Sequence, residues 1–184
     1  MEKARPVSLK EIRIRDNFWD KYRRLVREEI LKYQWCAMND QIEGAPKSHC
    51  IENFRIAAGE KQGEFYGAVF QDSDVAKWLE AVAYTLAEKP DKELKKLADS
   101  VIELIGRAQE PDGYFNTYFI LKEPGQRFRN LREGHELYTL GHMIEAAVAY
   151  KRATGEKRFL EIVQKMADLV ANTFGVEEGK RMGM

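Results

Sequence analysis

The chain has 184 residues, of which 33% are charged and 44% are hydrophobic, so it can form a core in water. Lys and Arg together number 30, as do Asp and Glu, and the zero net charge argues against a nucleic acid or an anionic membrane as partner. No apolar run approaches the roughly 20 residues of a membrane-spanning helix. The N-terminus lacks the apolar segment of a signal peptide, and two cysteines are too few for a disulfide framework, so we expect a reduced, cytoplasmic setting.

Apolar residues recur at helical spacing along most of the chain, and glycines lie mainly between the helical segments. In chain order the pattern predicts helices over about 17–39, 50–58, 74–88, 91–109, 135–154 and 157–173. The helices at 91–109 and 157–173 each carry one apolar stripe opposite charged residues, which is typical of helices with one side in solvent. Residues 110–133 contain a Pro-Asp-Gly turn and several aromatics, and we expect them to be irregular.

One short segment occurs twice. The sequence Ala-Val-Ala-Tyr at 81–84 returns at 147–150, an offset of 66 (147 − 81), and a short loop and a second helix follow each copy. The repeated unit is therefore a helical hairpin. One hairpin cannot bury its own apolar faces, and such units stack as solenoids or close into α/α toroids. The sequence thus predicts an all-α fold.

The helix predicted at 135–154 carries no charged residue on the side that bears its two histidines, His135 and His142. On a helical wheel that side also holds the small residues Thr139, Ala146, Ala149 and Ala153. The opposite side holds an apolar stripe of Leu137, Leu140, Ile144 and Val148. We therefore expect an inner helix of a toroid, with its apolar back on the outer helices and its histidine side facing a central cavity. Cavities lined by aromatics, histidines and carboxylates suit hydroxyl-rich sugars.

Several segments, taken in order, resemble the glycoside hydrolase family 127 enzymes, which are β-L-arabinofuranosidases and relatives. The first segments are Tyr33-Gln34-Trp35, Met38-Asn39-Asp40, Lys47-Ser48-His49, Ala57-Ala58-Gly59, Val69–Val75 and Lys77–Glu80. The later segments are Arg107-Ala108-Gln109, Asp112-Gly113-Tyr114, Gly134-His135-Glu136-Leu137-Tyr138, Gly141–Tyr150 and Met166–Gly175. Their shared order is more specific than any single motif, and the resemblance covers nearly the whole chain.

The resemblance implies a six-hairpin α/α toroid followed by β domains, in a retaining exo-hydrolase of β-L-arabinofuranosides. Its nucleophile is a cysteine thiolate held on zinc, and a glutamate is its general acid and base. Those residues lie far along a longer chain, so we expect residues 1–184 to be one incomplete, N-terminal segment of the toroid domain. We expect this segment to have no catalytic residue, no metal ligand and no cofactor, and to be inactive alone.

The resemblance assigns one sugar contact, the histidine that opens the His-Glu-x-Tyr motif, which is His135. His142 shares its side of the predicted helix. Gln71, Asp112 and Tyr114 lie in segments that resemble those at the cavity mouth of the family, and we include them as candidate substrate-binding residues. Structural alternatives are a helix-start histidine for His135, a core histidine for His142 and a simple turn at Asp112.

Other candidate sites are weaker. Asp72 and Asp74 form either a glycosidase carboxylate pair or the capped start of a helix, and we favour the cap. His49, Cys50 and Cys36 match no zinc spacing, and Thr139 stands where a His-Glu-x-x-His zinc motif needs its second histidine.

Two other functions remain open. The chain is either a helical-repeat module that binds sugar or protein, or part of another α/α toroid enzyme such as an unsaturated uronyl hydrolase or a sugar epimerase. A partial toroid leaves apolar hairpin flanks uncovered, so we also expect self-association.

Overall fold

The computed structural model describes residues 7–181. Its α-helices are α1 (Asn17–Leu25), α2 (Leu31–Met38), α3 (Cys50–Ala57), α4 (Asp72–Glu88), α5 (Lys92–Ala108), α6 (Thr117–Leu121), α7 (Leu131–Gly134), α8 (Glu136–Thr154) and α9 (Arg158–Thr173). Short helical turns add η1 (Leu9–Glu11), η2 (Val26–Ile30) and η3 (Pro124–Gln126), and η2 is a π-helical turn that joins α1 to α2. These residues contain no β-strand, so the predicted all-α fold is confirmed.

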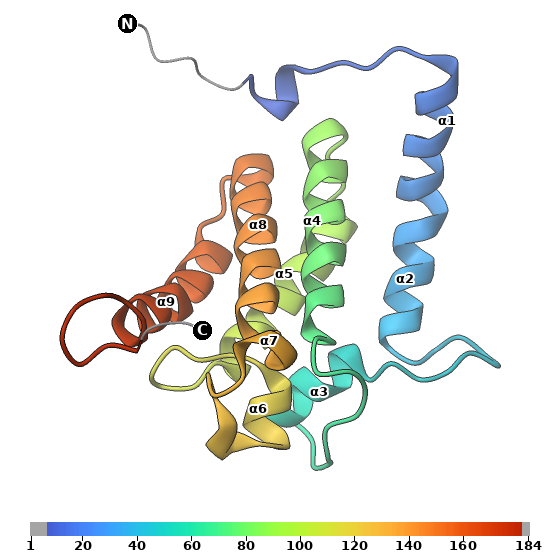
Figure 1. Ribbon diagram of the computed structural model, residues 1–184. Helices are drawn as coiled ribbons and strands as arrows, with labels where there is room; N and C mark the ends of the chain where they lie inside the picture. The colour runs from blue at the N-terminus through green and yellow to red at the C-terminus, as the bar shows by residue number, and fades with distance from the viewer. Residues whose placement is uncertain (1–6, 182–184) are drawn as a thin grey trace, which may run out of the picture.

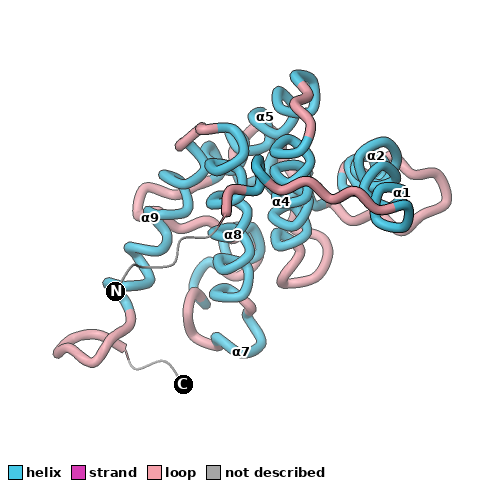
Figure 2. The backbone as a smooth tube through the Cα atoms, turned by 90° about the horizontal axis from the view of Figure 1, so that it is seen from above, coloured by secondary structure: helices cyan, strands magenta, loops and turns pink. Residues whose placement is uncertain are grey.

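The helices form two layers. Helices α2, α4 and α8 stand side by side, α5 lies behind α4, and α9 runs obliquely beside α8 (Figures 1 and 2). Each of the pairs α2–α4, α4–α8, α4–α5, α8–α9 and α5–α9 is in contact, and α3 packs against α5. The hairpins α4–α5 and α8–α9 are the repeated unit predicted from the sequence, and their arrangement is that of part of an α/α toroid. No helix within residues 7–181 is both long and apolar enough to cross a membrane.

The outer helices follow their sequence patterns closely. Helix α5 begins after Asp91, whose carboxylate accepts hydrogen bonds from the amides of Glu93 and Leu94, both at 3.0 Å. Its apolar stripe is buried, and so is that of α9. A single amphipathic face with a side-chain cap is enough to set where such a helix starts and which side it buries.

Helix α8 buries a different side from the one predicted. The small residues Thr139, Ala146 and Ala153 are buried, and the most extensive helix contact of α8 is with α4. Small side chains let two helices approach closely, so this stripe is packed and does not face a cavity. Leu137, predicted to lie in the core, is exposed, and the predicted core residue Val148 is half-buried. The wheel was right for Leu140, which is buried, and for Ile144, which packs against the core. It was wrong for the other residues because periodicity does not identify the neighbour that covers each side.

The internal repeat also has a different register from the one read in the sequence. Tyr84 and Tyr150 occupy equivalent places in the Ala-Val-Ala-Tyr segments, yet Tyr84 is 48% exposed and Tyr150 is 1% exposed. The burial patterns of α4 and α8 match at an offset of 64, which pairs Asp72 with Glu136 at the first position of each helix (136 − 72). A two-residue difference turns a side chain by about 200° around a helix, which accounts for the unlike tyrosines.

The connection between the hairpins is partly buried and partly helical. Predicted to be irregular, it contains the short helices α6 and α7. The Asn116 side chain accepts a hydrogen bond from the Phe119 amide at 3.3 Å and so caps α6, and Phe115 and Thr117 are fully buried. Helices of one turn give too short a pattern for periodicity to detect.

Candidate functional site

A group of exposed and half-buried rings gathers where α8 begins. His135 immediately precedes α8 and has a left-handed backbone, with a φ of 52°. Its ring forms T-shaped contacts with Phe70, with centroids 5.3 Å apart, and with Tyr138, with centroids 5.7 Å apart. Phe70 lies just before α4 and His135 just before α8, so residues at the starts of both inner helices contribute to this group. Helices α4 and α8 stand side by side (Figure 1).

The ring group continues along α8 and reaches α4. Tyr138 contacts the ring of His142, with centroids 4.6 Å apart, and the Lys77 ammonium of α4 lies 5.5 Å from the centroid of Tyr138. Nδ1 of His142 is 3.4 Å from Oε2 of Glu145, without hydrogen-bond geometry. We define His135, Phe70, Tyr138, His142 and Lys77 as the ring surface. Its apolar rings and polar nitrogens can contact the apolar and hydroxyl-bearing faces of a sugar.

Sequence reasoning found the two histidines of the ring surface and missed Phe70, Tyr138 and Lys77. Tyr138 was missed because the helical wheel assigned the cavity side to the alanines. The spacing of His135 and Tyr138, three residues apart on one helix, is a signal that identifies this pair. Nothing in the spacing of Phe70 or Lys77 connects them with α8, since Phe70 meets His135 and Lys77 meets Tyr138 only in the folded chain.

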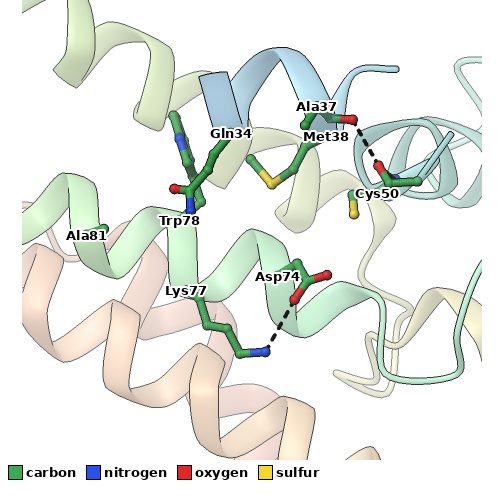
Figure 3. A pocket seen from close by; sticks show the side chains of 9 residues that line it. Gln34, Ala37, Met38, Cys50, Asp74, Lys77, Trp78 and Ala81 are labelled. Carbon is green, nitrogen blue, oxygen red and sulfur yellow. Dashed lines mark hydrogen bonds and ion pairs between the residues drawn. The ribbon is translucent and has the colours of Figure 1, made fainter. Parts of the chain in front are cut away.

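A pocket of about 340 Å³ lies beside the ring surface, between α2 and α4 (Figure 3). It is lined by Gln34, Ala37, Met38, Ser48, Cys50, Asp74, Lys77, Trp78 and Ala81. The ammonium of Lys77 lies 3.3 Å from Oδ1 of Asp74 and accordingly belongs to both the pocket and the ring surface. Burial raises the pKa of the Cys50 thiol, which keeps it protonated and unlike an activated nucleophile.

Gln71, a predicted substrate-binding residue, uses its side chain within the protein. Its amide nitrogen lies 2.9 Å from Sγ of Cys50 and donates to Oδ2 of Asp74 at 3.1 Å, and its oxygen accepts from the Ala68 amide at 3.2 Å. Gln71 therefore fixes the loop that carries Phe70 to the pocket wall. This arrangement favours an indirect role over direct contact with a sugar.

Asp72 and Asp74 are not a matched carboxylate pair. Asp72 is buried, and its carboxylate accepts hydrogen bonds from the amide and the hydroxyl of Thr117 at 2.7 and 2.6 Å. Burial raises its pKa to about 6, although the bonds from Thr117 oppose the shift. The predicted cap needs correction too, because Asp72 supports the start of α6 and not that of its own helix.

Asp112 and Tyr114 form hydrogen bonds within the protein. The Asp112 carboxylate accepts a hydrogen bond from the Tyr114 amide at 3.0 Å. This bond is part of a simple turn, which was the structural alternative for Asp112. Gly113 has a φ of 93° and packs so closely on Lys165 of the outer helix α9 that a Cβ would lie 2.8 Å from its carbonyl oxygen. Tyr114 is fully buried and donates its hydroxyl hydrogen to Glu136. These contacts give both residues a structural role, and their contact with a sugar stays a prediction.

Zinc, which the family resemblance implies, has no suitable ligand set in the described part of the chain. No three His, Cys, Asp or Glu side chains of residues 7–181 converge on a point that could hold a metal. Cys36 and Cys50 are both free thiols. We assign no metal ligand to these residues.

The paired helical layers are those of part of an α/α toroid, and this architecture defines the class of the protein. Residues 11–184 match the family described as the β-L-arabinofuranosidase GH127 catalytic domain, and the chain belongs to this family. The resemblance noted in the sequence is thereby confirmed, and it favours this family over the other toroid enzymes considered.

Similar proteins agree with this assignment. The chain is 45% identical to the non-reducing end β-L-arabinofuranosidase of Bifidobacterium longum subsp. longum, in an alignment of length 188 that covers 94% of this chain and 29% of that protein. A GH127 β-L-arabinofuranosidase from Geobacillus stearothermophilus T6 superposes with a TM-score of 0.90 and 64% identity, over 91% of this chain and 26% of that one. A second GH127 β-arabinofuranosidase superposes with a TM-score of 0.85 and 34% identity, over 96% of this chain and 28% of that one. The chain thus spans less than a third of each relative.

Proposed function

We propose that this chain forms one wall of the sugar-binding cavity of a retaining, exo-acting β-L-arabinofuranoside hydrolase. The observation that carries the proposal is the position of His135. It precedes the inner helix α8 with its ring between those of Phe70 and Tyr138, in a chain that belongs to the GH127 family. A His imidazole can donate to or accept from a sugar hydroxyl, and the two aromatic rings can pack on the apolar face of the sugar.

In this proposal the described residues bind and orient the sugar and perform no bond cleavage. His135 is the principal contact, and His142 extends the same surface along α8. Gln71 acts through the loop that carries Phe70. In the complete enzyme, zinc would stabilise a cysteine thiolate as the nucleophile, and no residue of 7–181 is assigned to hold it. The 184-residue chain alone is therefore expected to hydrolyse no aryl β-L-arabinofuranoside.

The proposal is tested in a graft that places residues 11–184 into the Geobacillus stearothermophilus enzyme, in place of its matching segment. We expect the graft to hydrolyse an aryl β-L-arabinofuranoside, and His135→Ala to lower kcat/KM at least about tenfold, which corresponds to about 1.4 kcal/mol. His49→Ala is the matched control, because His49 also precedes a helix with a left-handed backbone. Equal kcat/KM for the graft and its His135→Ala variant would contradict a sugar contact at His135.

A second candidate function is a helical module that binds sugar or protein without hydrolysis. It is favoured by apolar side chains exposed on α1, namely Phe18, Trp19 and Tyr22. We propose that these side chains also cause self-association of the 184-residue chain. If the graft is inactive while the chain still binds a methyl arabinofuranoside, this second function is preferred.

We also propose a cytoplasmic location. Cys36 and Cys50 are free thiols, and free cysteines are usual in proteins of reducing compartments. Fractionation of the source cells, followed by detection of the chain with an antibody, tests this location.

A further inference from the structure

The inner helices α4 and α8 each begin with a buried carboxylate. Asp72 is 2% exposed and Glu136 is 0% exposed, and each is the first residue of its helix. Asp72 directly follows Gln71, and Glu136 directly follows His135, and both preceding residues are predicted to bind the sugar. Buried carboxylates are rare unless they are paired or hydrogen-bonded, so their bonding partners indicate what they hold together.

Both carboxylates bind the connection between the two hairpins. Asp72 accepts two hydrogen bonds from Thr117. Glu136 accepts one from the Tyr114 hydroxyl on Oε1 and one from the Phe128 amide on Oε2, the latter at 2.8 Å. The starts of the two adjacent inner helices are therefore hydrogen-bonded to three residues of this connection, Tyr114, Thr117 and Phe128.

Glu136 is the next residue after His135, so the bonds that hold Glu136 also restrict the backbone of His135. A left-handed backbone is unfavourable for any residue with a Cβ, and His135 would relax by joining α8 as an ordinary helical residue. Glu136 opposes this relaxation from one side, because both of its oxygens are fixed in the core. Gly134 opposes it from the other side, because it packs so tightly on Phe119 that a Cβ would lie 3.0 Å from that ring.

Arg127 covers the network from outside. Its guanidinium lies 4.1 Å from the centroid of the Tyr114 ring, and it pairs with Glu110 and with Asp112. The Tyr114 hydroxyl and the Glu136 carboxylate are thus shielded from water, which strengthens the bond between them.

We propose that Glu136 is a positioning residue for His135. Through the Tyr114 hydroxyl and the Phe128 amide, it holds His135 in its left-handed turn with the imidazole between Phe70 and Tyr138. The glutamate of the His-Glu-x-Tyr motif thereby acts on the sugar site from the core, without touching the sugar. The role in sugar binding rests on the function proposed above, whereas the effect on the geometry of His135 does not.

The test uses NMR spectroscopy of the full 184-residue chain. The chain has three histidines, so their imidazole resonances can be assigned individually. We expect Tyr114→Phe and Glu136→Gln to shift the imidazole and backbone resonances of His135 and to weaken its contacts with the Phe70 ring. The resonances of His49 should stay unchanged.

Tyr150→Phe is the matched control. Tyr150 is also a buried tyrosine, and it lies on the part of α8 far from His135. Its hydroxyl donates to Oδ1 of Asp99 in α5 at 2.6 Å. The Tyr150→Phe variant should have a lower melting temperature than the wild type, as Tyr114→Phe should, but its His135 resonances should not shift. The proposal is overturned if Tyr114→Phe lowers the melting temperature but leaves the His135 resonances and the Phe70 contacts unchanged. Should Tyr114→Phe fail to fold, Glu136→Gln decides by the same measurement.

A kinetic measurement separates this proposal from the function on which it rests. In the graft, Tyr114→Phe is expected to lower kcat/KM about tenfold through misplacement of His135, and Tyr150→Phe to change it less than about twofold. If His135→Ala leaves kcat/KM unchanged, the proposed sugar contact fails, and the NMR result still decides whether Glu136 positions His135.

Discussion

Asp72 and Thr117 are joined by two hydrogen bonds that run from the start of α4 to the start of α6. The Asp72 carboxylate accepts from the Thr117 amide at 2.7 Å and from its hydroxyl at 2.6 Å. The residues are 45 positions apart in the sequence. Because the carboxylate is buried, the pair couples the stability of this end of the molecule to pH.

The stability of the chain should fall as the pH rises from about 4 to about 6. Burial raises the pKa of Asp72 from 3.8 to about 6 in the folded chain. The folded chain therefore binds the proton more tightly than the unfolded one, and the stabilisation is complete below pH 4 and lost as the pH passes 6. The difference is about 3 kcal/mol. Urea unfolding of the wild type and of Asp72→Asn at several pH values tests this. The prediction is contradicted if the free energy of unfolding depends on pH in the same way for both proteins.

Glycine at position 135 should stabilise the chain relative to alanine. The φ of 52° is unfavourable for residues with a Cβ. We therefore expect the free energy of unfolding of His135→Gly to be about 1 kcal/mol higher than that of His135→Ala. Both variants should lose the sugar contact, which separates stability from function. Urea unfolding measures the difference. Greater stability of the alanine variant would mean that the backbone at this position is not left-handed in solution.

The two tyrosines of the Ala-Val-Ala-Tyr segments should respond differently to loss of the hydroxyl. Tyr150→Phe removes a bond from a buried hydroxyl to Asp99 and should cost about 1 kcal/mol. Tyr84→Phe removes an exposed bond to Glu80 and should cost less than about 0.5 kcal/mol. Thermal unfolding of both variants provides the comparison. Equal costs would favour the repeat register read from the sequence over the structural one.

Opposite sides of α8 should tolerate added volume differently. Ala146 is fully buried, so Ala146→Leu should destabilise by about 1–3 kcal/mol through overpacking. Gly141 lies on the exposed side with no atom within 4 Å of an added Cβ, so Gly141→Ala should stabilise by about 0.5–1 kcal/mol. Denaturant unfolding measures both. A neutral Ala146→Leu would show that this side faces open space, as the helical wheel predicted.

The 184-residue chain should associate with itself through α1. Light scattering coupled to size-exclusion chromatography should give a mass above 21.4 kDa at high concentration. Replacing Phe18 and Trp19 by serine should return the mass to that of a monomer, because both side chains are exposed and apolar. Val176→Ser, which changes an exposed apolar residue elsewhere, is the control and should leave association unchanged. A monomeric wild type at all concentrations would contradict the prediction.

The outer helices could be predicted from the sequence almost to the residue. The pattern at 91–109 and 157–173 gave helices observed as Lys92–Ala108 and Arg158–Thr173. Each has one apolar stripe and one charged side, and the Asp91 carboxylate fixes the start of the first. Such a helix carries its orientation in its own composition, because only one of its sides can be placed in water at low cost.

The sequence by itself determined the family, the hairpin repeat and the choice of His135 as the candidate sugar contact. Only the tertiary structure decided which side of α8 is packed, why Tyr84 and Tyr150 differ, and that Phe70 and Lys77 join the histidines. It also decided that the carboxylates of Asp72 and Glu136 are buried to hold the connection between the hairpins. The physical reason is the same in each case: a side chain on an inner helix is covered by neighbours distant in sequence, and local periodicity holds no information about them.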